Sequence, residues 1–408
     1  MSKDGLRAAD EGRFKDAEAL FRQALELSAE FDQSDPRHAT SINNLAYALH
    51  ANGNYYDAVD VYLNAISIRE AVLGPDHPDV AESCNNLAEL YRMLGRYEDS
   101  ERLHRRALDI RKKRFGEDHP ESAQSMNNLG VLYAHRRLFD KAGALYRKAL
   151  AIRERSYGED HPATAETRNN LATLHYAEGR FAAAESLYLQ AIEIEQKALE
   201  DHHPSLATTL SNLAELYRSQ GKLDQALELH QRAIEIRSQG LGPKHPATAQ
   251  SLNNLAVTQF ERGNEAQAEK LYRESLLIQK MVLGESHPDL ALTLNNFAEL
   301  LRGQRRFDEA KPLYRQALAI EEAAFGPDHP DLALGLNNLA LLHFDRGAYI
   351  EAKNLLDRAL AIEEENFGPG NTGLIVTLEN YAIVLRELRR HREAEKVEAR
   401  AETLRARL

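Results

Sequence analysis

The sequence predicts an all-α protein, a right-handed solenoid of antiparallel helix pairs, and three observations carry this prediction. The dipeptide His-Pro recurs every 42 residues from His77 to His329. An asparagine recurs with the same period in nine of nine repeats, from Asn44 to Asn380. A third column holds a small residue, alanine in eight of its nine positions. A strict period along the whole chain indicates one repeat array instead of several unrelated domains.

The period also gives the boundaries of the repeats. We expect residues 1–35 to form a truncated first repeat, and residues 372–408 to form a last repeat whose highly charged second helix caps the array. About ten repeats would then make up a single solenoid over residues 1–408. The full repeats between the two ends are 36–77, 78–119, 120–161, 162–203, 204–245, 246–287, 288–329 and 330–371.

The first helix of a repeat is exemplified by the segment that begins at Pro78. Proline suits the first helical position, because the N–H that it lacks would have no partner there. Leu87, Tyr91 and Leu94 then recur with helical spacing and form an apolar stripe. Gly95 interrupts this pattern and predicts the end of the helix.

The second helix of the same repeat carries its own apolar stripe, with Tyr97, Leu103, Ala107 and Ile110. It is expected to end at Gly116, since glycine readily adopts the left-handed conformation after a helix. The small alanine side chains allow the two helices to approach closely. Neither helix can bury its stripe alone, so neighbouring pairs must stack on one another.

Composition limits the classes of function. The 408 residues include 51 Lys and Arg against 63 Asp and Glu, a net charge of −12, which argues against binding to nucleic acid or to an anionic membrane. A single cysteine, Cys84, excludes an internal disulfide and a cysteine-based zinc site. The sequence has no apolar signal segment and no run of 18 apolar residues, so we expect a cytoplasmic protein without a membrane span.

The segment NNLAELYRMLGRYEDSERLHRRALDI, residues 85–110, resembles a tetratricopeptide repeat. The 42-residue period, with His-Pro before the first helix and Leu-Gly or Phe-Gly after the second, resembles the longer repeats of kinesin light chains. This resemblance implies a non-enzymatic scaffold that binds a partner protein or an extended peptide in its concave groove. The alternative that it implies is a cytoskeletal protein that binds a tubulin-like filament or a motor complex.

The asparagine column lies on the face of the first helix opposite the core. In the repeat at 78–119 this face holds positions 82, 85, 86, 89, 92 and 93, and in a right-handed superhelix it lines the concave groove. An asparagine amide both donates and accepts hydrogen bonds, so a row of them can pair with the backbone of an extended peptide. The other interpretation is structural, since identical residues in nine repeats can bridge neighbouring repeats.

The resemblance also implies individual binding residues. In kinesin light chains the matching asparagines contact cargo peptides, together with an arginine near the end of the second helix and another in the Leu-Tyr-Arg segment of the first. In this sequence the asparagines are Asn86, Asn128, Asn170, Asn212, Asn254, Asn296 and Asn338, the second-helix arginines are Arg69, Arg111, Arg153 and Arg237, and the first-helix arginines are Arg92, Arg218 and Arg302.

The variable positions of this face change along the chain. The second-helix column changes from arginine in the early repeats to glutamate at 321 and 363, while Leu292, Leu334 and Val376 enter the first-helix face late. We therefore expect an extended partner segment that is acidic toward the N-terminal half and has an apolar anchor toward the C-terminal half. Ordinary pairing of the arginines with neighbouring glutamates is the alternative.

The histidines of the His-Pro dipeptides invite a metal interpretation. Each belongs to a different repeat, so neighbouring histidines lie too far apart to share an ion, and capping of helix starts is the better account. Cys84 is expected to be a packing residue. The sequence has no motif for phosphate binding, nucleophilic catalysis or zinc hydrolysis, so we expect no catalytic residue, no metal and no cofactor. A monomer or weak dimer is expected.

Overall fold

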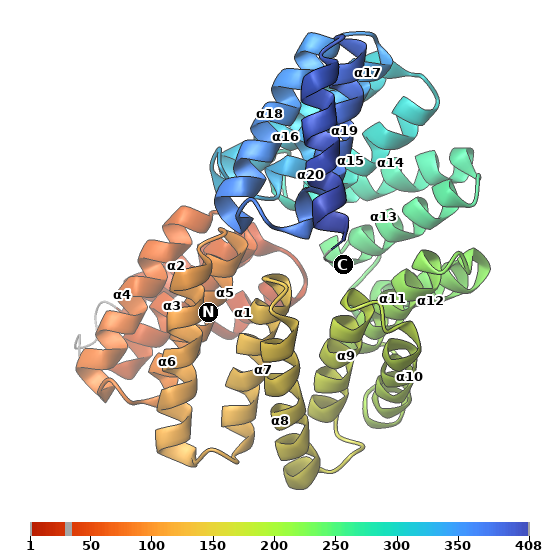
Figure 1. The fold of residues 1–408 in the computed structure, drawn as a ribbon. Helices are drawn as coiled ribbons and strands as arrows, with labels where there is room; N and C mark the ends of the chain where they lie inside the picture. The colour runs from red at the N-terminus through yellow and green to blue at the C-terminus, as the bar shows by residue number, and fades with distance from the viewer. Residues whose placement is uncertain (1, 29–34, 407–408) are drawn as a thin grey trace. The chain divides into compact units, whose positions relative to one another are not determined.

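The computed structural model describes residues 2–28 and 35–406, and within these ranges every regular element is helical. The helices follow one another in pairs joined by short turns, as Figure 1 shows. This confirms the predicted all-α solenoid of antiparallel helix pairs. The chain forms two compact units, residues 1–283 (the N-terminal unit) and residues 284–408 (the C-terminal unit). The single array over residues 1–408 stays a prediction.

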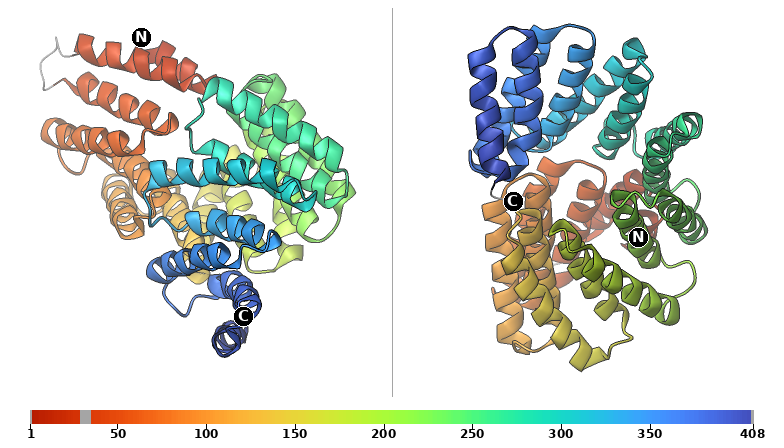
Figure 2. Two further views of the ribbon diagram at one scale, coloured as in Figure 1. Left: turned by 90° about the horizontal axis from the view of Figure 1, so that it is seen from above. Right: turned by 45° about the vertical axis from the view of Figure 1, so that its right-hand side comes forward.

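The N-terminal unit stacks its helices in chain order. The two helices of each repeat pack together, and the second helix of one repeat packs against the first helix of the next. Figure 2 shows these successive layers from two further directions. The helices are α1 (Ser2–Asp10), α2 (Phe14–Ser28), α3 (Pro36–Ala51), α4 (Tyr55–Leu73), α5 (Pro78–Met93), α6 (Tyr97–Phe115), α7 (Pro120–His135), α8 (Phe139–Tyr157), α9 (Pro162–Ala177), α10 (Phe181–Ala198), α11 (Pro204–Ser219), α12 (Leu223–Gly240), α13 (Pro246–Glu261) and α14 (Glu265–Val282).

The C-terminal unit repeats this arrangement. Its helices are α15 (Asp289–Gly303), α16 (Phe307–Phe325), α17 (Leu332–Asp345), α18 (Tyr349–Phe367), α19 (Ile375–Glu387) and α20 (His391–Arg405), with the short 3₁₀ helix η1 (Thr372–Leu374) before α19. The last repeat has no His-Pro dipeptide. There the Asn371 side chain accepts the backbone N–H of Gly373 at 2.7 Å and takes over the capping role.

The histidine of each His-Pro dipeptide caps the start of a first helix. His77 Nδ1 accepts a hydrogen bond from the backbone N–H of Asp79 at 3.2 Å. This satisfies one of the N–H groups that the first turn of a helix leaves without a partner. The capping prediction is therefore confirmed, and the same bond recurs at His119, His161, His203, His245, His287 and His329.

The glycines that end the second helices have positive φ angles, as predicted, but an unexpected ψ. Gly74 has φ 91° and ψ 155°, and Gly116 has φ 101° and ψ 160°. The predicted left-handed helical conformation needs ψ near 45°, so that detail was wrong. The observed region is open almost only to glycine, because any Cβ would clash with the backbone. The need for glycine is thus stronger than the prediction assumed.

Small residues bring the two helices of a repeat close together. Gly130 on α7 faces the ring of Tyr146 on α8, and a Cβ added to Gly130 would lie only 2.6 Å from that ring. Tyr146 is 2% exposed, and Ala107 in the small-residue column is fully buried. Cys84 is also fully buried, as expected of a packing residue, and burial raises the pKa of its thiol to about 11.

Across residues 2–28 and 35–406, no helix combines the length and the apolar character that crossing a bilayer would require.

Candidate functional site

The face of the first helices that points away from the core is the candidate binding surface. We call it the first-helix face and define it by the positions of Glu82, Asn86, Glu89 and Arg92 on α5 and by their counterparts in the other repeats. Glu82 is exposed, and the other three are partly buried. Each repeat thus presents four side chains that can reach a partner without unfolding the helix pair.

The asparagine column is half-buried in every repeat, and several of its amides bond to the neighbouring first helix. Asn170 donates from Nδ2 to Asn127 Oδ1 at 3.1 Å, and Asn212 donates to Asn169 Oδ1 at 3.0 Å. Asn380 donates to Asn337 in the same way, at 3.2 Å. These bonds support the structural interpretation of the column, and each amide keeps further donor and acceptor capacity for a ligand.

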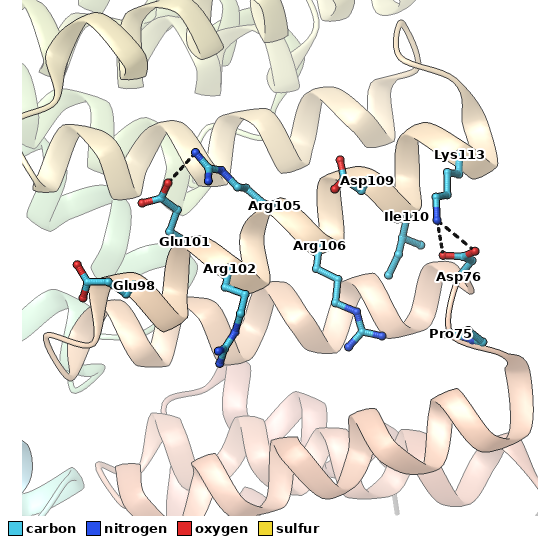
Figure 3. Close-up of a pocket in the computed structure, with 10 residues that line it drawn as sticks. All are labelled: Pro75, Asp76, Glu98, Glu101, Arg102, Arg105, Arg106, Asp109, Ile110 and Lys113. Carbon is cyan, nitrogen blue, oxygen red and sulfur yellow. Dashed lines mark hydrogen bonds and ion pairs between the residues drawn. The ribbon is translucent and has the colours of Figure 1, made fainter.

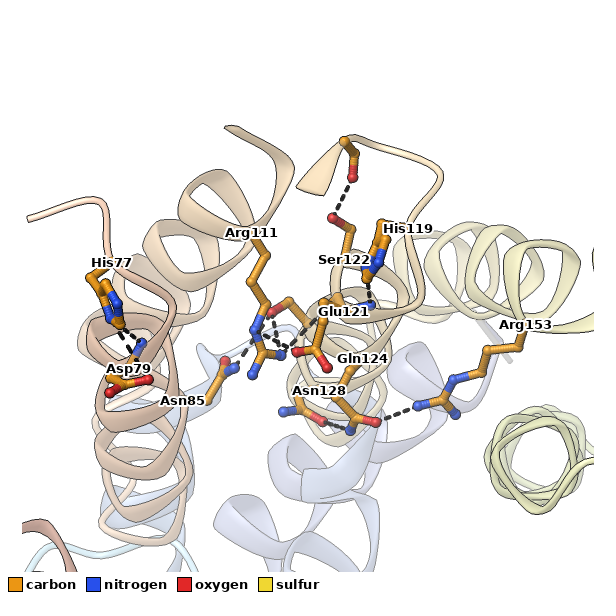
Figure 4. A network of polar contacts seen from close by, with 12 residues as sticks. His77, Asp79, Asn85, Arg111, His119, Glu121, Ser122, Gln124, Asn128 and Arg153 are labelled. Atoms are coloured by element: carbon orange, nitrogen blue, oxygen red, sulfur yellow. Dashed lines mark hydrogen bonds and ion pairs between the residues drawn. The ribbon is translucent and has the colours of Figure 1, made fainter. Parts of the chain in front are cut away.

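Some other members of the column bond within their own helix. Asn128 accepts from Gln124 at 3.0 Å (Figure 4), and Asn254 accepts from Asn253 at 3.2 Å. Among the described residues, Asn44, Asn86 and Asn338 form no hydrogen bond through their side chains. These three amides are therefore the ones most open to a partner. Asn296 is partly buried like the rest and has a partner.

Asn85, the residue before Asn86, is not on the first-helix face, contrary to the prediction for position 85. It is 7% exposed, its Oδ1 accepts from His104 Nδ1 at 3.0 Å, and its Nδ2 donates to Ser125 at 3.4 Å. Burial lowers the pKa of His104 to about 4, so this histidine is neutral near pH 7. The pair of asparagines therefore divides its roles, the first buried at the junction and the second at the surface.

The second-helix arginines lie at the junctions between repeats. Arg153 is 1% exposed, and its Nη1 donates to the Ala163 carbonyl and to Thr167 Oγ1, both at 2.7 Å. Arg69 Nη1 donates equivalent hydrogen bonds to the Asp79 carbonyl at 2.5 Å and to Ser83 Oγ at 2.8 Å. Arginine at this position fastens each second helix to the next first helix. Its role in partner binding stays a prediction.

The same hydrogen bond is present at two more junctions. We therefore call this position of the second helices the linking column. Arg111 donates to Ser125 at 3.1 Å (Figure 4), and Arg237 donates to Ser251. Burial lowers the pKa of both guanidinium groups, although not enough to discharge them near pH 7. The full linking column is Arg69, Arg111, Arg153, Glu195, Arg237, Gln279, Glu321 and Glu363.

Three glutamates of the linking column have a carboxyl oxygen without a hydrogen-bond partner, and none pairs with a cation among the described residues. Glu195 is buried, whereas Glu321 and Glu363 are partly buried. Glu195 is 3% exposed, and burial raises the pKa of its carboxyl to about 7. Burial, with Asp331 and Glu322 nearby, raises the pKa of Glu321 to about 8. Burial also raises the pKa of Glu363. The sequence showed the change from arginine to glutamate but not that these carboxyl groups have oxygens without a hydrogen-bond partner.

The first-helix arginines are half-buried and paired with acidic residues. Arg302 contacts Glu299 on its own helix at 2.6 Å and Asp345 on α17 at 2.6 Å. Tyr314 donates to Glu299 at 2.8 Å from the second helix. Burial alone would raise the pKa of Glu299, but its hydrogen bonds with Arg302 and Tyr314 hold that pKa below its usual value. This cluster is a rigid charged patch of the first-helix face.

The other two first-helix arginines show related patterns. Arg218 contacts Glu215 at 2.8 Å and also pairs with Glu261 on α13. His230 approaches Glu215 at 3.4 Å from the second helix. Arg92 pairs with Glu89. A partner that binds these arginines must therefore share them with, or displace, their present carboxylates.

A hollow of about 660 Å³ lies on α6 and beside the turn before α5 (Figure 3). Its cations already have acidic partners: Arg105 contacts Glu101 at 2.8 Å and Lys113 contacts Asp76 at 3.1 Å. Because the charges of the hollow are balanced, it does not favour an anionic ligand. In the described part of the chain no three His, Cys, Asp or Glu residues are grouped as metal ligands.

The outermost position of the first-helix face differs between the two units. In the N-terminal unit it is always polar, as at Glu82, Gln124 and Glu166. In the C-terminal unit it holds Leu292, Leu334 and Val376, which are 45%, 57% and 62% exposed. Each unit therefore offers a partner a different chemistry.

The chain matches the model of one protein family along most of its length. A tetratricopeptide repeat model matches residues 37–113, 84–137, 121–197, 174–239, 205–281, 260–323, 289–347 and 331–407. The chain belongs to the tetratricopeptide repeat family, as the repeat pattern predicted. Membership supports a protein-interaction scaffold. No curated protein sequence matches the chain at significant similarity.

Solved structures give the same class of fold. RapI in its apo form shares 15% identity with a TM-score of 0.52, over 70% of this chain and 97% of RapI. A kinesin light chain-type protein with nearly identical repeats from Podosopora anserina shares 26% identity with a TM-score of 0.41, over 50% of this chain and 97% of that one. BtubC (BKLC) from P. vanneervenii shares 24% identity with a TM-score of 0.46, over 55% of this chain and 91% of BtubC.

Proposed function

We propose that this chain is a non-enzymatic scaffold that binds a partner protein, or an extended segment of one, along the first-helix face. The observation that carries the proposal is the half-buried asparagine that each of nine repeats places on this face. The helix fixes the backbone that carries each amide and partial burial restricts the side chain, so pairing with a ligand costs little further side-chain entropy. The repeat spacing lets one ligand meet several amides in succession.

Asn86 and Asn338 allow this proposal to be tested with little risk to the fold, because neither side chain bonds to another described residue. The full chain would be used to select binders from a library of random displayed peptides. Selected peptides should lose affinity for the Asn86→Ala or the Asn338→Ala variant by roughly three- to tenfold.

The matched control is Lys270→Ala, at an exposed position of a second helix. It should leave the affinity unchanged. Failure to select any peptide, or selection of peptides that bind both asparagine variants as tightly as the wild type, would contradict the proposal.

The acidic character expected of the partner rests on Arg92 and Arg218, which are the cations of the first-helix face in the N-terminal unit. The arginines of the linking column contribute less, since their guanidinium groups are used at the repeat junctions. A cytoplasmic location and a monomeric or weakly dimeric state belong to the same proposal. Light scattering after size exclusion would measure the oligomeric state.

The cytoskeletal alternative follows from the 42-residue type of repeat. Co-sedimentation of the full chain with polymers of purified tubulin would separate it from the general scaffold. Pelleting that requires the polymer favours the alternative, and a chain that stays in the supernatant argues against it.

A further inference from the structure

The linking column lies beside the outermost positions of the first-helix face. In the N-terminal unit Arg153 contacts Glu166 of the next repeat at 3.2 Å and also bonds to Gln124 of its own repeat (Figure 4). Arg237 donates to Thr208 of its own repeat at 3.0 Å. A side chain in this column therefore lies between the outermost face residue of its own repeat and that of the next.

In the C-terminal unit this register places carboxyl groups between apolar side chains. Glu321 corresponds to Arg153, so its neighbours by repeat register are Leu292 and Leu334. Glu363 lies one repeat further, between Leu334 and Val376. We call these five residues, Leu292, Glu321, Leu334, Glu363 and Val376, the acidic-apolar strip.

The carboxyl group of Glu321 lacks a partner within the described part of the chain. Its Oε2 is buried and forms no hydrogen bond, and the same is true of Oδ1 of Asn295. The charged groups that face it are Asp331 and Glu322, both acidic. Glu322 already pairs with Arg358, and Asp331 lies 3.8 Å from His329. A buried polar group without a partner is costly, so this site favours an incoming cation.

Gly335 leaves Glu321 without the hydroxyl partner that this position supplies in other repeats. In the N-terminal unit the equivalent position is serine or threonine, which bonds to the linking arginine, as Thr167 does with Arg153. A Cβ added to Gly335 would lie 3.3 Å from Glu321 Oε2 and 3.7 Å from Asn295 Nδ2. The glycine therefore avoids crowding the carboxyl group and offers it no hydrogen bond.

We propose that the acidic-apolar strip binds an extended, lysine-bearing segment of a partner protein, whose apolar side chains cover Leu292, Leu334 and Val376 while a lysine ammonium pairs with Glu321 over Gly335. This inference rests on the proposed function, because it names the partner chemistry for one part of the first-helix face. Charge complementarity selects the cation, and a lysine has the long stem and compact charge that a narrow space between apolar side chains requires.

Spacing agrees with an extended segment. Packed helices lie about 8–10 Å apart, which sets the approximate step between successive apolar residues of the strip. A polyproline II segment presents every third residue on one side, with a repeat of about 9 Å. A partner with an apolar residue at every third position can therefore cover Leu292, Leu334 and Val376 together.

The test is fluorescence anisotropy with the full chain at physiological salt. The probe is a labelled peptide of about four Leu-Pro-Lys repeats, which forms polyproline II and carries both required features. Comparison peptides replace every lysine with glutamate or every leucine with serine. We expect the Leu-Pro-Lys peptide to bind roughly tenfold or more tightly than either comparison peptide.

Three substitutions locate the binding site. Glu321→Gln and Leu334→Asp should each weaken binding roughly tenfold. Gly335→Ala should also weaken it, because the added Cβ would crowd Glu321 Oε2 at 3.3 Å, and a thermal melt of this variant separates a loss of binding from a loss of fold. Glu365→Gln changes the net charge equally at an exposed second-helix position and should leave the affinity unchanged.

The inference is overturned if the Leu-Pro-Lys peptide does not bind, if the Leu-Pro-Glu peptide binds as tightly, or if Glu365→Gln weakens binding as much as Glu321→Gln. It is also overturned if light scattering shows a dimer that Leu334→Asp dissociates, because a second copy would then occupy the strip. If these peptides fail while library peptides still depend on Asn86, the scaffold function stands and only this partner chemistry is wrong.

Discussion

Arg153 donates a hydrogen bond of 2.7 Å to Thr167, across the junction between two repeats and with almost no exposure of the arginine to solvent. The contact joins α8 to α9, and it recurs between Arg69 and Ser83. A stacked array depends on such junctions, because each repeat contacts little besides its neighbours. The linking column therefore makes the stability of the array a local property of each junction.

Arg153→Ala should destabilise the N-terminal unit by about 2–4 kcal/mol, since it removes the hydrogen bonds to the Ala163 carbonyl, Thr167 and Gln124 and leaves these groups short of a donor. Chemical denaturation followed by circular dichroism would measure the change in midpoint. The control is Arg155→Ala on the same helix, where the arginine is 64% exposed and paired with Asp118. Exposed pairs contribute little, so this control should shift stability by less than about 0.5 kcal/mol. Equal effects of the two substitutions would contradict the junction role.

Glu195 makes a second junction dependent on pH. Its pKa is about 7 in the folded chain and about 4.5 when the chain is unfolded, so the folded state binds the proton more tightly. The stability that this carboxyl contributes is fully present below about pH 4.5 and is lost as the pH rises to about 7. Glu195→Gln removes the ionisable group and should stabilise the protein at about pH 8, by an amount on the order of 2–3 kcal/mol, with little effect near pH 4.5.

Melting temperatures of the Glu195→Gln variant and the wild type would be compared at both ends of this pH range. Glu193→Gln serves as the control on the same helix, because Glu193 is exposed and paired with Lys197 at 2.6 Å. A difference between Glu195→Gln and wild type that stays constant with pH would show that Glu195 does not titrate in this range.

The repeat period predicted most of the fold because the residues that mark helix ends recur with the same 42-residue period as the helices themselves. Pro78 and Gly116 marked the ends of one helix pair, and the same residue types did so in the other repeats. The period could not decide where individual side chains go. Asn85 and Asn86 are adjacent, yet one is buried at a junction and the other is half-exposed.

The candidate site was harder to predict for the same reason. An arginine on a predicted helix can face solvent or cross a junction, and the sequence of that helix is the same in both cases. The signal that was missed is the residue 14 positions further on, which is serine or threonine after every member of the linking column except Glu321, where it is Gly335. Paired columns of this kind show contacts between repeats, whereas a single column shows only a face.

The glycine that ends each second helix gives a further prediction. Gly116 has φ 101° and ψ 160°, a conformation that costs a residue with a Cβ about 1–3 kcal/mol, so Gly116→Ala should lower stability by that amount. The matched control is Glu200→Ala, at the one place where the chain already has a different residue in this column. Glu200 is not among the described residues with positive φ, so its substitution should be nearly neutral. A neutral effect of Gly116→Ala in denaturation experiments would contradict the conformational argument.

Binding of the Leu-Pro-Lys peptide should depend on pH through Glu321. The pKa of this carboxyl is about 8 without ligand, so near pH 6 it is mostly protonated and cannot pair with a lysine ammonium. Raising the pH to about 9 ionises Glu321 while lysine, with a pKa of about 10.4, keeps its charge. Affinity should therefore rise over this range, and peptide binding should release a proton at neutral pH.

Asp331, Glu322 and His329 are the other titratable groups near Glu321 on α16 and before α17. Asp331 and Glu322 remain in the Glu321→Gln variant, so any pH dependence of binding that they cause would persist in that variant. The variant should bind weakly with an affinity that changes little between about pH 6 and pH 9. Anisotropy titrations at several pH values would measure both curves, and parallel curves for the two proteins would assign the pH dependence to another group.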